Sequence, residues 1–333
     1  MKDSVLITGC AGLLGARLAD WIVEKHPEYE VVGIDNLFGG YKENINNSVI
    51  FYNNDLSNDD ISYIFERHAI KYVFHFAAYA PEGLSYFMPM FNDKNNTLST
   101  DNILKESVKY GVKRFIYTSS MAVYGEGEHE GRIFDEIDRP HPVDPYGVSK
   151  YACERNIEII GNKFGMDWCI IRPHNVYGIK QNIWDKYRNV LGIWMYQILN
   201  NQPMLIYGDG EQTRAFSYID DCLEPLWNAA VLPEASREII NLGGEYAISI
   251  NDAARLLCEV TGVNNIKYCE KREEVKHAVP TFQKSKDILK YKSTTSLKDG
   301  LTEMWRWAQE QPKRPQYKWD NYEIEKDIYS YWK

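Results

Sequence analysis

A tyrosine and a lysine four residues apart are the side chains in this sequence best suited to catalysis. Tyr146 and Lys150 occur in the run YGVSK at residues 146–150, and residues i and i+4 lie on one face of a helix. A tyrosine phenol has an ordinary pKa of about 10, which is too high for a base at neutral pH. A nearby lysine cation and a positively charged cofactor ring would lower that pKa by stabilising the phenolate. The spacing therefore favours a general base over an exposed helical pair.

A hydroxyl side chain at the end of a strand is the expected third member of such a site. The stretch at residues 115–120, FIYTSS, supplies several hydroxyls and leads into MAVYG at residues 121–125. A hydroxyl at this position can hydrogen-bond the reacting oxygen of a sugar and orient that oxygen toward the tyrosine.

A glycine-rich turn follows the first predicted strand. Residues 8–15 read TGCAGLLG, with Gly9, Gly12 and Gly15 in a G-x-x-G-x-x-G spacing. Glycines at these positions permit a tight turn, a close approach of the backbone to a pyrophosphate, and close helix–strand packing. The amides at the start of the following helix then favour phosphate charge. The turn predicts a dinucleotide site.

An aspartate at the end of the second predicted strand supports the same site. Asp35 can hydrogen-bond both ribose hydroxyls of an adenosine and would repel a 2′-phosphate. No arginine stands next to Asp35 in the sequence, so NAD is favoured over NADP. Asp55, after the third predicted strand, is expected to contact the adenine or to cap a helix, and the sequence leaves both open.

The elements that would position these residues alternate between strand and helix. Strands are predicted at residues 5–8, 30–34, 49–52, 72–76, 114–118 and 168–172. Helices are predicted at residues 13–25, 59–68, 95–110 and 145–163. This alternation is typical of an α/β fold with a doubly wound parallel (Rossmann) sheet.

The regular alternation of strands and helices ends after Pro173, and we expect a smaller mixed α/β lobe for substrate there. Helices are predicted at residues 187–200, 251–261 and around 301–308, and strands at 204–207 and 215–219. We expect a dinucleotide-binding domain at residues 1–173 and a substrate lobe at 174–333, with some later segments returning to the first sheet. The aromatic tail at residues 312–333 is expected to pack on its own subunit, with partner binding as the alternative.

Composition excludes several classes of protein. The 333 residues are 44% hydrophobic and 26% charged, which is typical of a globular protein. The net charge of −9 makes nucleic acid and anionic membranes poor candidate partners. No apolar run is long enough to span a bilayer, and no secretion signal is apparent at Met1. The six cysteines form no C-x-x-C pair, which indicates reduced thiols, a cytoplasmic location and no metal site.

At this point the chain resembles the extended short-chain dehydrogenase/reductases, in particular the nucleotide-sugar epimerases typified by UDP-glucose and UDP-N-acetylglucosamine 4-epimerase. The resemblance runs to about residue 311. It rests on the glycine turn and the Tyr146–Lys150 pair together with the runs DNL at 35–37, HFAA at 75–78, SSMAVYG at 119–125, RPHNVYG at 172–178 and RAFSYIDD at 214–221.

The resemblance implies a role for each matching residue. The catalytic residues would be Ser120, Tyr146 and Lys150. NAD would be bound by Gly9, Gly12, Leu13, Leu14, Gly15, Asp35, Asn36, Asp55, Leu56, Phe76, Ala77, Ala78, Tyr146, Lys150 and Pro173. The UDP-sugar would be bound by Asn96, Ser120, Tyr146, Asn175, Asn189, Tyr207, Arg214 and Arg272. The alternative role for Asn96 is at the N-terminus of a helix. The alternative role for the two arginines is in surface salt bridges.

The implied activity is NAD-dependent reversible 4-epimerisation of a UDP-hexose through a 4-keto intermediate. The alternatives are UDP-glucuronate 4-epimerase, a dehydratase or a reductase. Related dehydratases carry Asp-Glu where this chain has Met121-Ala122, which cannot exchange protons with carbon and so argues against elimination. The loop at residues 79–83 differs from the family's Lys-containing sugar loop. A small gate residue, Ala278, would leave room for an acetamido group, and a homodimer through helices 95–110 and 145–163 is expected.

Overall fold

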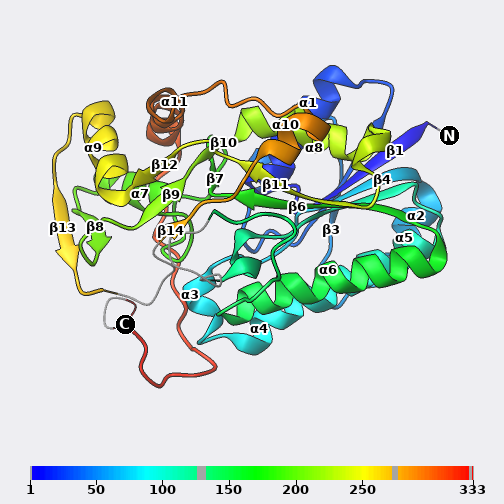
Figure 1. Ribbon diagram of the computed structural model, residues 1–333, viewed down its shortest axis with the longest axis horizontal. Helices are drawn as coiled ribbons and strands as arrows, with labels where there is room; N and C mark the ends of the chain where they lie inside the picture. The colour runs from blue at the N-terminus through cyan, green and yellow to red at the C-terminus, as the bar shows by residue number, and fades with distance from the viewer. Residues whose placement is uncertain (1, 126–132, 272–276, 330–331, 333) are drawn as a thin grey trace.

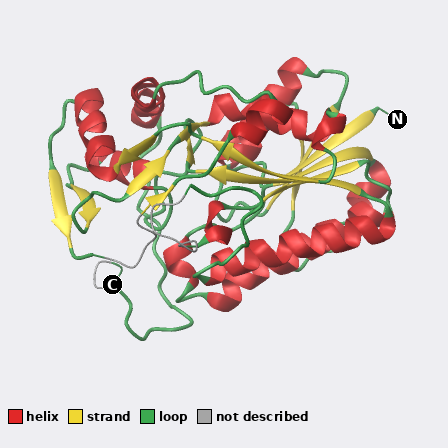
Figure 2. Cartoon of the chain, viewed as in Figure 1, coloured by secondary structure: helices red, strands yellow, loops and turns green. Residues whose placement is uncertain are grey.

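A seven-stranded parallel sheet forms the centre of the computed structural model, which describes residues 2–125, 133–271, 277–329 and 332 (Figures 1 and 2). The strand order is β11-β6-β5-β4-β1-β2-β3, and all neighbours are parallel. The strands are β1 (Asp3–Thr8), β2 (Glu30–Asp35), β3 (Ile50–Asn53), β4 (Ala69–His75), β5 (Arg114–Thr118), β6 (Asp167–His174) and β11 (Glu238–Gly243). The predicted doubly wound fold is confirmed.

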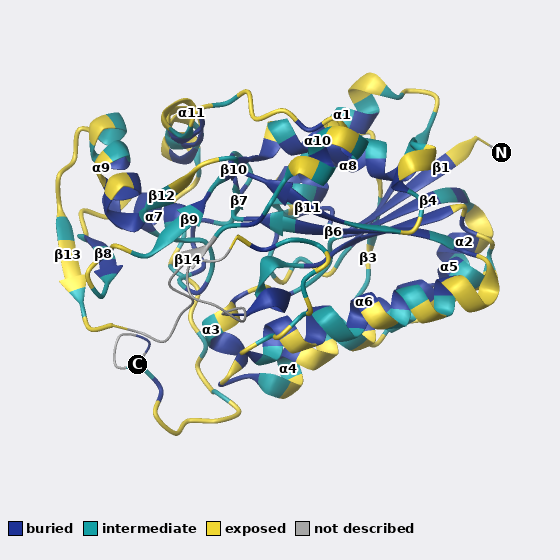
Figure 3. Ribbon diagram, in the orientation of Figure 1, coloured by how far each residue is buried: buried dark blue, intermediate teal, exposed yellow. Residues whose placement is uncertain are grey.

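Both faces of this sheet are buried, which explains its nearly continuous apolar strands. In β1, Val5 and Ile7 belong to one hydrophobic cluster and Leu6 to another, because successive strand residues point to opposite faces. Figure 3 shows the central strands buried, whereas α6 alternates between buried and exposed residues.

Helices cover both faces of the sheet (Figure 1). One face carries α1 (Leu13–Lys25), α8 (Ile219–Val231) and α10 (Gln283–Leu289). The other carries α2 (Ser62–Arg67), α5 (Ser99–Lys109) and α6 (Pro145–Phe164). Ahead of α5 lie α3 (Glu82–Ser85), α4 (Pro89–Asp93) and a π-helical stretch, Lys94–Leu98, that makes α4 and α5 one continuous helix.

Short sheets and three helices form the second part of the molecule. The parallel pair β8 (Met204–Tyr207) and β13 (Ile266–Cys269) is one sheet, and β7 (Val176–Tyr177) pairs with β10 (Ser217–Tyr218). A third sheet has the order β12 (Ala247–Ser249), β9 (Thr213–Ala215), β14 (His277–Ala278). The helices are α7 (Val190–Leu199), α9 (Ile250–Thr261) and α11 (Leu297–Glu310). The 3₁₀ turns are Lys42–Asn44, Met121–Tyr124 and Pro233–Ala235.

The strand predicted at residues 215–219 is wrong at its end. Extended backbone stops at Tyr218, and α8 begins at Ile219 with Asp220 and Asp221 in its first turn, where carboxylates favour the helix dipole. The sequence interpretation missed α8, because Pro225 inside it reads as a helix breaker. The strand that follows α8, β11, pairs with β6 and so extends the first sheet. The domain division at residue 173 stays a prediction.

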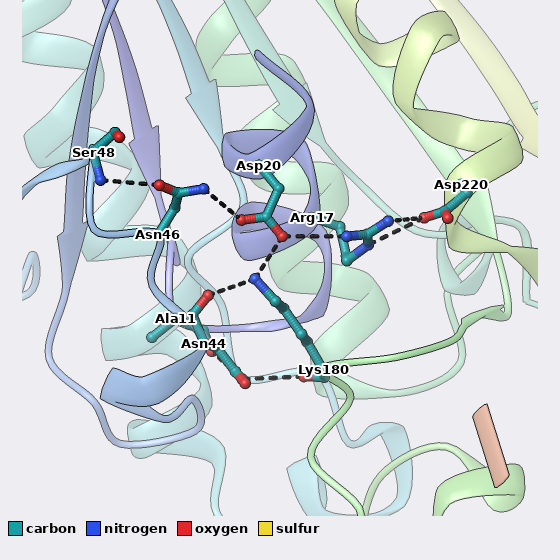
Figure 4. A network of polar contacts seen from close by, with 8 residues as sticks. All are labelled: Ala11, Arg17, Asp20, Asn44, Asn46, Ser48, Lys180 and Asp220. Carbon is teal, nitrogen blue, oxygen red and sulfur yellow. Dashed lines mark hydrogen bonds and ion pairs between the residues drawn. The ribbon is translucent and has the colours of Figure 1, made fainter. Parts of the chain in front are cut away.

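A polar network centred on Asp20 ties α1 to the second part of the chain (Figure 4). Asp20 accepts hydrogen bonds from Lys180 at 2.5 Å, from Arg17 at 3.2 Å and from Asn46 at 3.1 Å. Arg17 also donates to Asp220, at the start of α8, at 2.7 Å. These contacts fix α1, and the glycine turn before it, against the segment around residue 180. Within the described residues, no helix has the length and apolar character to cross a bilayer.

Candidate functional site

A cavity of about 1100 Å³ opens at the carboxyl ends of the parallel strands. The glycine turn and the end of β2 line one part of the cavity. The residues after β5 and the start of α6 line its middle, and residues of α7, β8 and β9 line another part. Strand order reverses between β1 and β4, the place where doubly wound sheets bind their ligands. The cavity therefore joins the predicted cofactor and substrate residues.

The glycine turn is packed so closely that side chains would not fit. Gly9 has φ of +70°, and a Cβ on Gly9 would lie 2.9 Å from the Ala77 nitrogen. A Cβ on Gly15 would lie 2.2 Å from the Gly9 oxygen. Helix α1 begins directly after Gly12 with no side-chain cap, so its first N–H groups remain available to an anion. This bare backbone cradle fits a dinucleotide pyrophosphate.

Asp35 ends β2 beside that cradle. Its Oδ2 accepts from the Ala11 amide at 3.0 Å and its Oδ1 from the Leu37 amide at 2.7 Å. Burial raises the pKa of Asp35, and these two amides and the Arg188 cation lower it. Each carboxylate oxygen keeps a second lone pair with which to accept a ribose hydroxyl.

No arginine is next to Asp35 in the sequence, but the fold brings Arg188 near it. Arg188 acts electrostatically on Asp35 and lines the same cavity. Its Nε donates to Asp185 at 2.9 Å, and its guanidinium carbon lies 5.2 Å from the centre of the Tyr79 ring. The Asp185 carboxylate thus partly neutralises the arginine, so its presence does not build a free 2′-phosphate site.

The other predicted cofactor residues lie along the same wall. Asp55 accepts from the Ser57 amide and hydroxyl and lines the cavity; it caps no helix, since α2 starts after Ile61. The cavity is also lined by Gly9, Gly12, Leu13, Leu14, Gly15, Asn36, Leu56, Phe76, Ala77, Ala78 and Pro173.

Tyr146 lies in the first turn of α6, which Asp144 caps by accepting from the Gly147 amide at 2.7 Å. The tyrosine is buried, and burial is the main reason that its pKa is raised. The carboxylates of Glu82 and Asp144 raise the pKa of Tyr146 further, while a hydrogen bond with Ser120 and the Arg188 cation lower it. Forming the phenolate therefore needs additional positive charge beside the ring.

Lys150 supplies a cation one helical turn from Tyr146. Its Nζ donates to the Thr118 carbonyl at 2.9 Å and lies 5.8 Å from the centre of the Tyr146 ring. Burial lowers the pKa of Lys150 to about 8, against the charges of Cys153 and Glu154, which raise it. Ser120 follows β5 and accepts from the Ala122 amide at 3.1 Å. The end of β5 and the start of α6 thus bring the three predicted catalytic residues together.

The predicted sugar-nucleotide residues are distributed between the cavity wall and its surroundings. Asn175, Asn189, Tyr207 and Arg214 line the cavity, and Asn189 also caps α7 by accepting from the Leu191 amide at 3.0 Å. Arg272 lies outside the described residues. For Ala278 the backbone pairs with Arg214 in β14 and β9, and its role as a gate stays a prediction.

Asn96 lies behind the wall. It is buried in the π-helical stretch, accepts from the Tyr79 amide at 3.0 Å and donates to the Tyr79 carbonyl at 3.2 Å. Asn96 therefore holds the residue 79–83 loop from behind, and the predicted helix N-terminus is not at this position because α4 runs straight into the π turn.

The wall also contains residues to which the sequence interpretation assigned no role in the site, among them Glu82, Arg188, Tyr329 and Trp332. Glu82 lies in the loop whose sequence departs from the family pattern. The aromatic tail stands out by composition, but no local pattern indicates that it reaches this cavity. The tail packs on its own subunit, in a cluster with Tyr79, Leu84, Phe87, Met88 and Tyr187.

Comparison with known proteins decides the family. The model of the NAD dependent epimerase/dehydratase family matches residues 5–243. The chain belongs to this family. The predicted resemblance is therefore confirmed, and so is NAD as the cofactor, which the cradle at Gly9–Gly15 fits.

Solved structures of similar proteins agree with this family. UDP-glucose 4-epimerase of Thermotoga maritima, solved with UDP-glucose, is 31% identical, with a TM-score of 0.86 and coverage of 92% of this chain and 98% of that one. UDP-glucuronic acid 4-epimerase of Bacillus cereus, solved with UDP-glucuronic acid and NAD, is 29% identical, with a TM-score of 0.83 and coverage of 92% and 99%. UDP-N-acetylglucosamine 4-epimerase of Methanobrevibacter ruminantium, solved with UDP-N-acetylmuramic acid, is 28% identical, with a TM-score of 0.83 and coverage of 92% and 98%.

Proposed function

We propose that this family member catalyses the reversible 4-epimerisation of a UDP-hexose. The observation that carries the proposal is the convergence of Ser120, Tyr146 and Lys150 on the cavity that the glycine turn also lines. A binding protein without turnover would need the cofactor cradle but not this buried acid–base set.

The chain's own residues provide the proton path for this reaction. Tyr146, as the phenolate, takes the proton of the sugar 4-hydroxyl, and Ser120 hydrogen-bonds the same oxygen to orient it. NAD, held by the glycine turn and Asp35, would supply reversible hydride exchange at C4, so that the 4-keto sugar can regain its hydride on the opposite face. Tyr146 then gives its proton back to the oxygen, and Lys150 balances the charge of the phenolate between these steps.

The residues beside Ser120 support epimerisation over elimination or decarboxylation. Met121 and Ala122 line the cavity next to Ser120, and neither side chain can donate or accept a proton. Chemistry at C5 or C6 would need such a group. Hydride and hydroxyl-proton transfer at C4 needs only Tyr146 and its partners.

The charges near Tyr146 favour a neutral hexose. Glu82 lines the cavity and acts electrostatically on Tyr146, so a uronate carboxylate bound at this end would meet a like charge. Arg188 is already engaged by Asp185, and Arg214 lines the cavity with the other residues assigned to the UDP moiety, where a guanidinium group binds a diphosphate well. UDP-glucose and UDP-N-acetylglucosamine are therefore the proposed substrates, ahead of UDP-glucuronate.

A panel of nucleotide sugars tests this proposal. The purified protein is incubated separately with UDP-glucose, UDP-N-acetylglucosamine and UDP-glucuronate, and NMR reads the configuration at C4 of each product. We expect the 4-epimer of a neutral sugar without net use of added cofactor. Loss of water or CO₂, or consumption of added reduced cofactor, would reject epimerisation in favour of a dehydratase, decarboxylase or reductase.

A homodimer and a cytoplasmic location also remain proposals. Val148 and Ile159 on α6 are 53% and 57% exposed, and Leu98 before α5 is 51% exposed. Apolar side chains exposed on these two helices support pairing through them. Sedimentation at several protein concentrations measures the assembly, and a monomer throughout would reject the dimer.

A further inference from the structure

The chain beyond α11 crosses back over the molecule to the cavity, and Figure 1 shows it in red running down past α3. Its first contacts are with the cofactor side of the molecule. The Arg314 guanidinium lies 3.9 Å from the centre of the Tyr41 ring, and the Tyr317 amide donates to the Trp184 carbonyl at 2.7 Å. The tail thus starts from a fixed position.

The middle of the tail is anchored to α4 by both backbone and side chain. The Glu323 carboxylate accepts from the Met90 and Phe91 amides at 2.7 and 2.9 Å, which satisfies two N–H groups in the first turn of that helix. The Glu323 and Ile324 amides each donate to the Phe87 carbonyl at 3.1 Å. Exposed tails without such partners would not keep one position.

Trp332 packs between α3 and the segment that precedes α7. Trp332 is 7% exposed, and its ring centre lies 4.9 Å from that of Tyr187. Its carbonyl accepts from the Lys186 ammonium at 2.8 Å. A Cβ on Gly83 would lie 3.4 Å from the Trp332 ring, so the indole rests on α3. Tyr329 packs edge-on to Trp332 at 5.1 Å, and both rings line the cavity.

Helix α3 connects this aromatic pair to the catalytic tyrosine. The Ser85 hydroxyl of α3 accepts from the Tyr146 amide at 3.2 Å, and Glu82 at the start of α3 acts on the Tyr146 phenol. The tail therefore packs on the same short helix that contacts the catalytic tyrosine, and its Tyr329 and Trp332 side chains line the cavity.

We propose that Trp332 and Tyr329 form the outer wall of the hexose subsite and determine which sugar the enzyme accepts. The proposal rests on the proposed function and deepens it. An aromatic face packs against the C–H face of a neutral hexose and excludes water from it. Because both side chains of this wall are aromatic and the nearby Lys186 ammonium is bonded to the Trp332 carbonyl, the wall suits a neutral hexose or N-acetylhexosamine attached to UDP.

Binding of UDP and of UDP-hexose to the NAD-loaded protein tests the wall separately from turnover. In Trp332→Ala, we expect the Kd of UDP-glucose and UDP-N-acetylglucosamine, measured by calorimetry, to rise about tenfold, as loss of one aromatic contact implies. The Kd of UDP alone should change less than about twofold, because UDP does not reach the wall. Trp332→Phe should retain most of the affinity, since it keeps an aromatic face.

Trp307→Ala is the matched control, because this tryptophan belongs to α11, packs against the hydrophobic core and does not line the cavity. It should leave both Kd values unchanged. Equal weakening of UDP and UDP-hexose by Trp332→Ala, or no weakening of either, would overturn the proposal. If the wild-type protein binds UDP-hexoses through Trp332 but forms no 4-epimer, the proposed function fails while the aromatic wall stands.

Discussion

The Lys150 ammonium lies 5.8 Å from the centre of the Tyr146 ring, one turn further along α6. The same nitrogen donates to the Thr118 carbonyl at 2.9 Å, at the end of the strand that leads into Ser120. Burial raises the pKa of Tyr146 and lowers that of Lys150 to about 8. Burial therefore disfavours the charged form of both groups, and the Lys150 ammonium is close enough to stabilise the Tyr146 phenolate when that phenolate forms.

Replacing Tyr146 with Phe should abolish turnover and spare binding. The variant keeps the ring and loses the group that exchanges the 4-hydroxyl proton, so the rate should fall by about 10³-fold or more. NMR of the product sugar measures the rate, and calorimetry measures the affinity for NAD and UDP. Tyr151→Phe, on the same helix but outside the cavity wall, should keep its activity. Near-normal turnover in Tyr146→Phe would remove this residue from its assigned role.

Lys150 should make the free energy of unfolding depend on pH in the alkaline range. Its pKa of about 8 in the folded state lies below the ordinary lysine pKa of 10.5, so between these pH values the unfolded chain binds more protons. The free energy of unfolding contributed by this group therefore rises with pH from 8 to 10.5, by up to about 3 kcal/mol. Urea unfolding of wild type and Lys150→Met across this range measures the difference, and parallel pH curves for the two proteins would contradict the prediction.

Asp35 should set the preference for NAD. In Asp35→Ser the hydrogen bonds to the ribose hydroxyls are lost, and the Kd of NAD should rise about tenfold to a hundredfold. The Kd of NADP should rise less or fall, because the carboxylate no longer repels the 2′-phosphate and Arg188 lies nearby. Fluorescence titration with both dinucleotides measures the ratio. Asp60→Ser, on the exposed turn before α2, serves as control, and an unchanged NAD/NADP ratio in Asp35→Ser would count against the assignment.

The Glu82 carboxylate should lower the activity of the enzyme toward UDP-glucuronate and raise the pKa of Tyr146. In Glu82→Gln, kcat/KM for UDP-glucuronate should rise up to about tenfold relative to UDP-glucose, as removal of one like charge near solvent allows. Because the Glu82 carboxylate raises the pKa of Tyr146, the acidic limb of the pH–rate profile should move to lower pH. Glu66→Gln on α2 is the control for a general change in charge. A pH profile and a sugar ratio that match the wild type would show that Glu82 does not act on this end of the cavity.

The sequence by itself determined the parts of this protein that depend on local pattern. Alternating strands and helices, the glycines from Gly9 to Gly15 and the four-residue spacing of Tyr146 and Lys150 all act over a few residues. Steric demands on a tight turn and the geometry of one helix face are fixed by such neighbours. For this reason the fold class, the family and the cofactor followed from the sequence.

Only the tertiary structure decided which distant residues complete the cavity. Arg188 reaches the neighbourhood of Asp35 because the segment before α7 packs against the loop after β2, where Asn182 donates to the Gly39 carbonyl at 3.1 Å. No spacing in the chain encodes that approach. Trp332 meets Gly83, and the tail that carries it is anchored to α4 through Glu323. Contacts of this kind come from long-range packing, in which side-chain shape and burial, rather than periodicity, choose the partner.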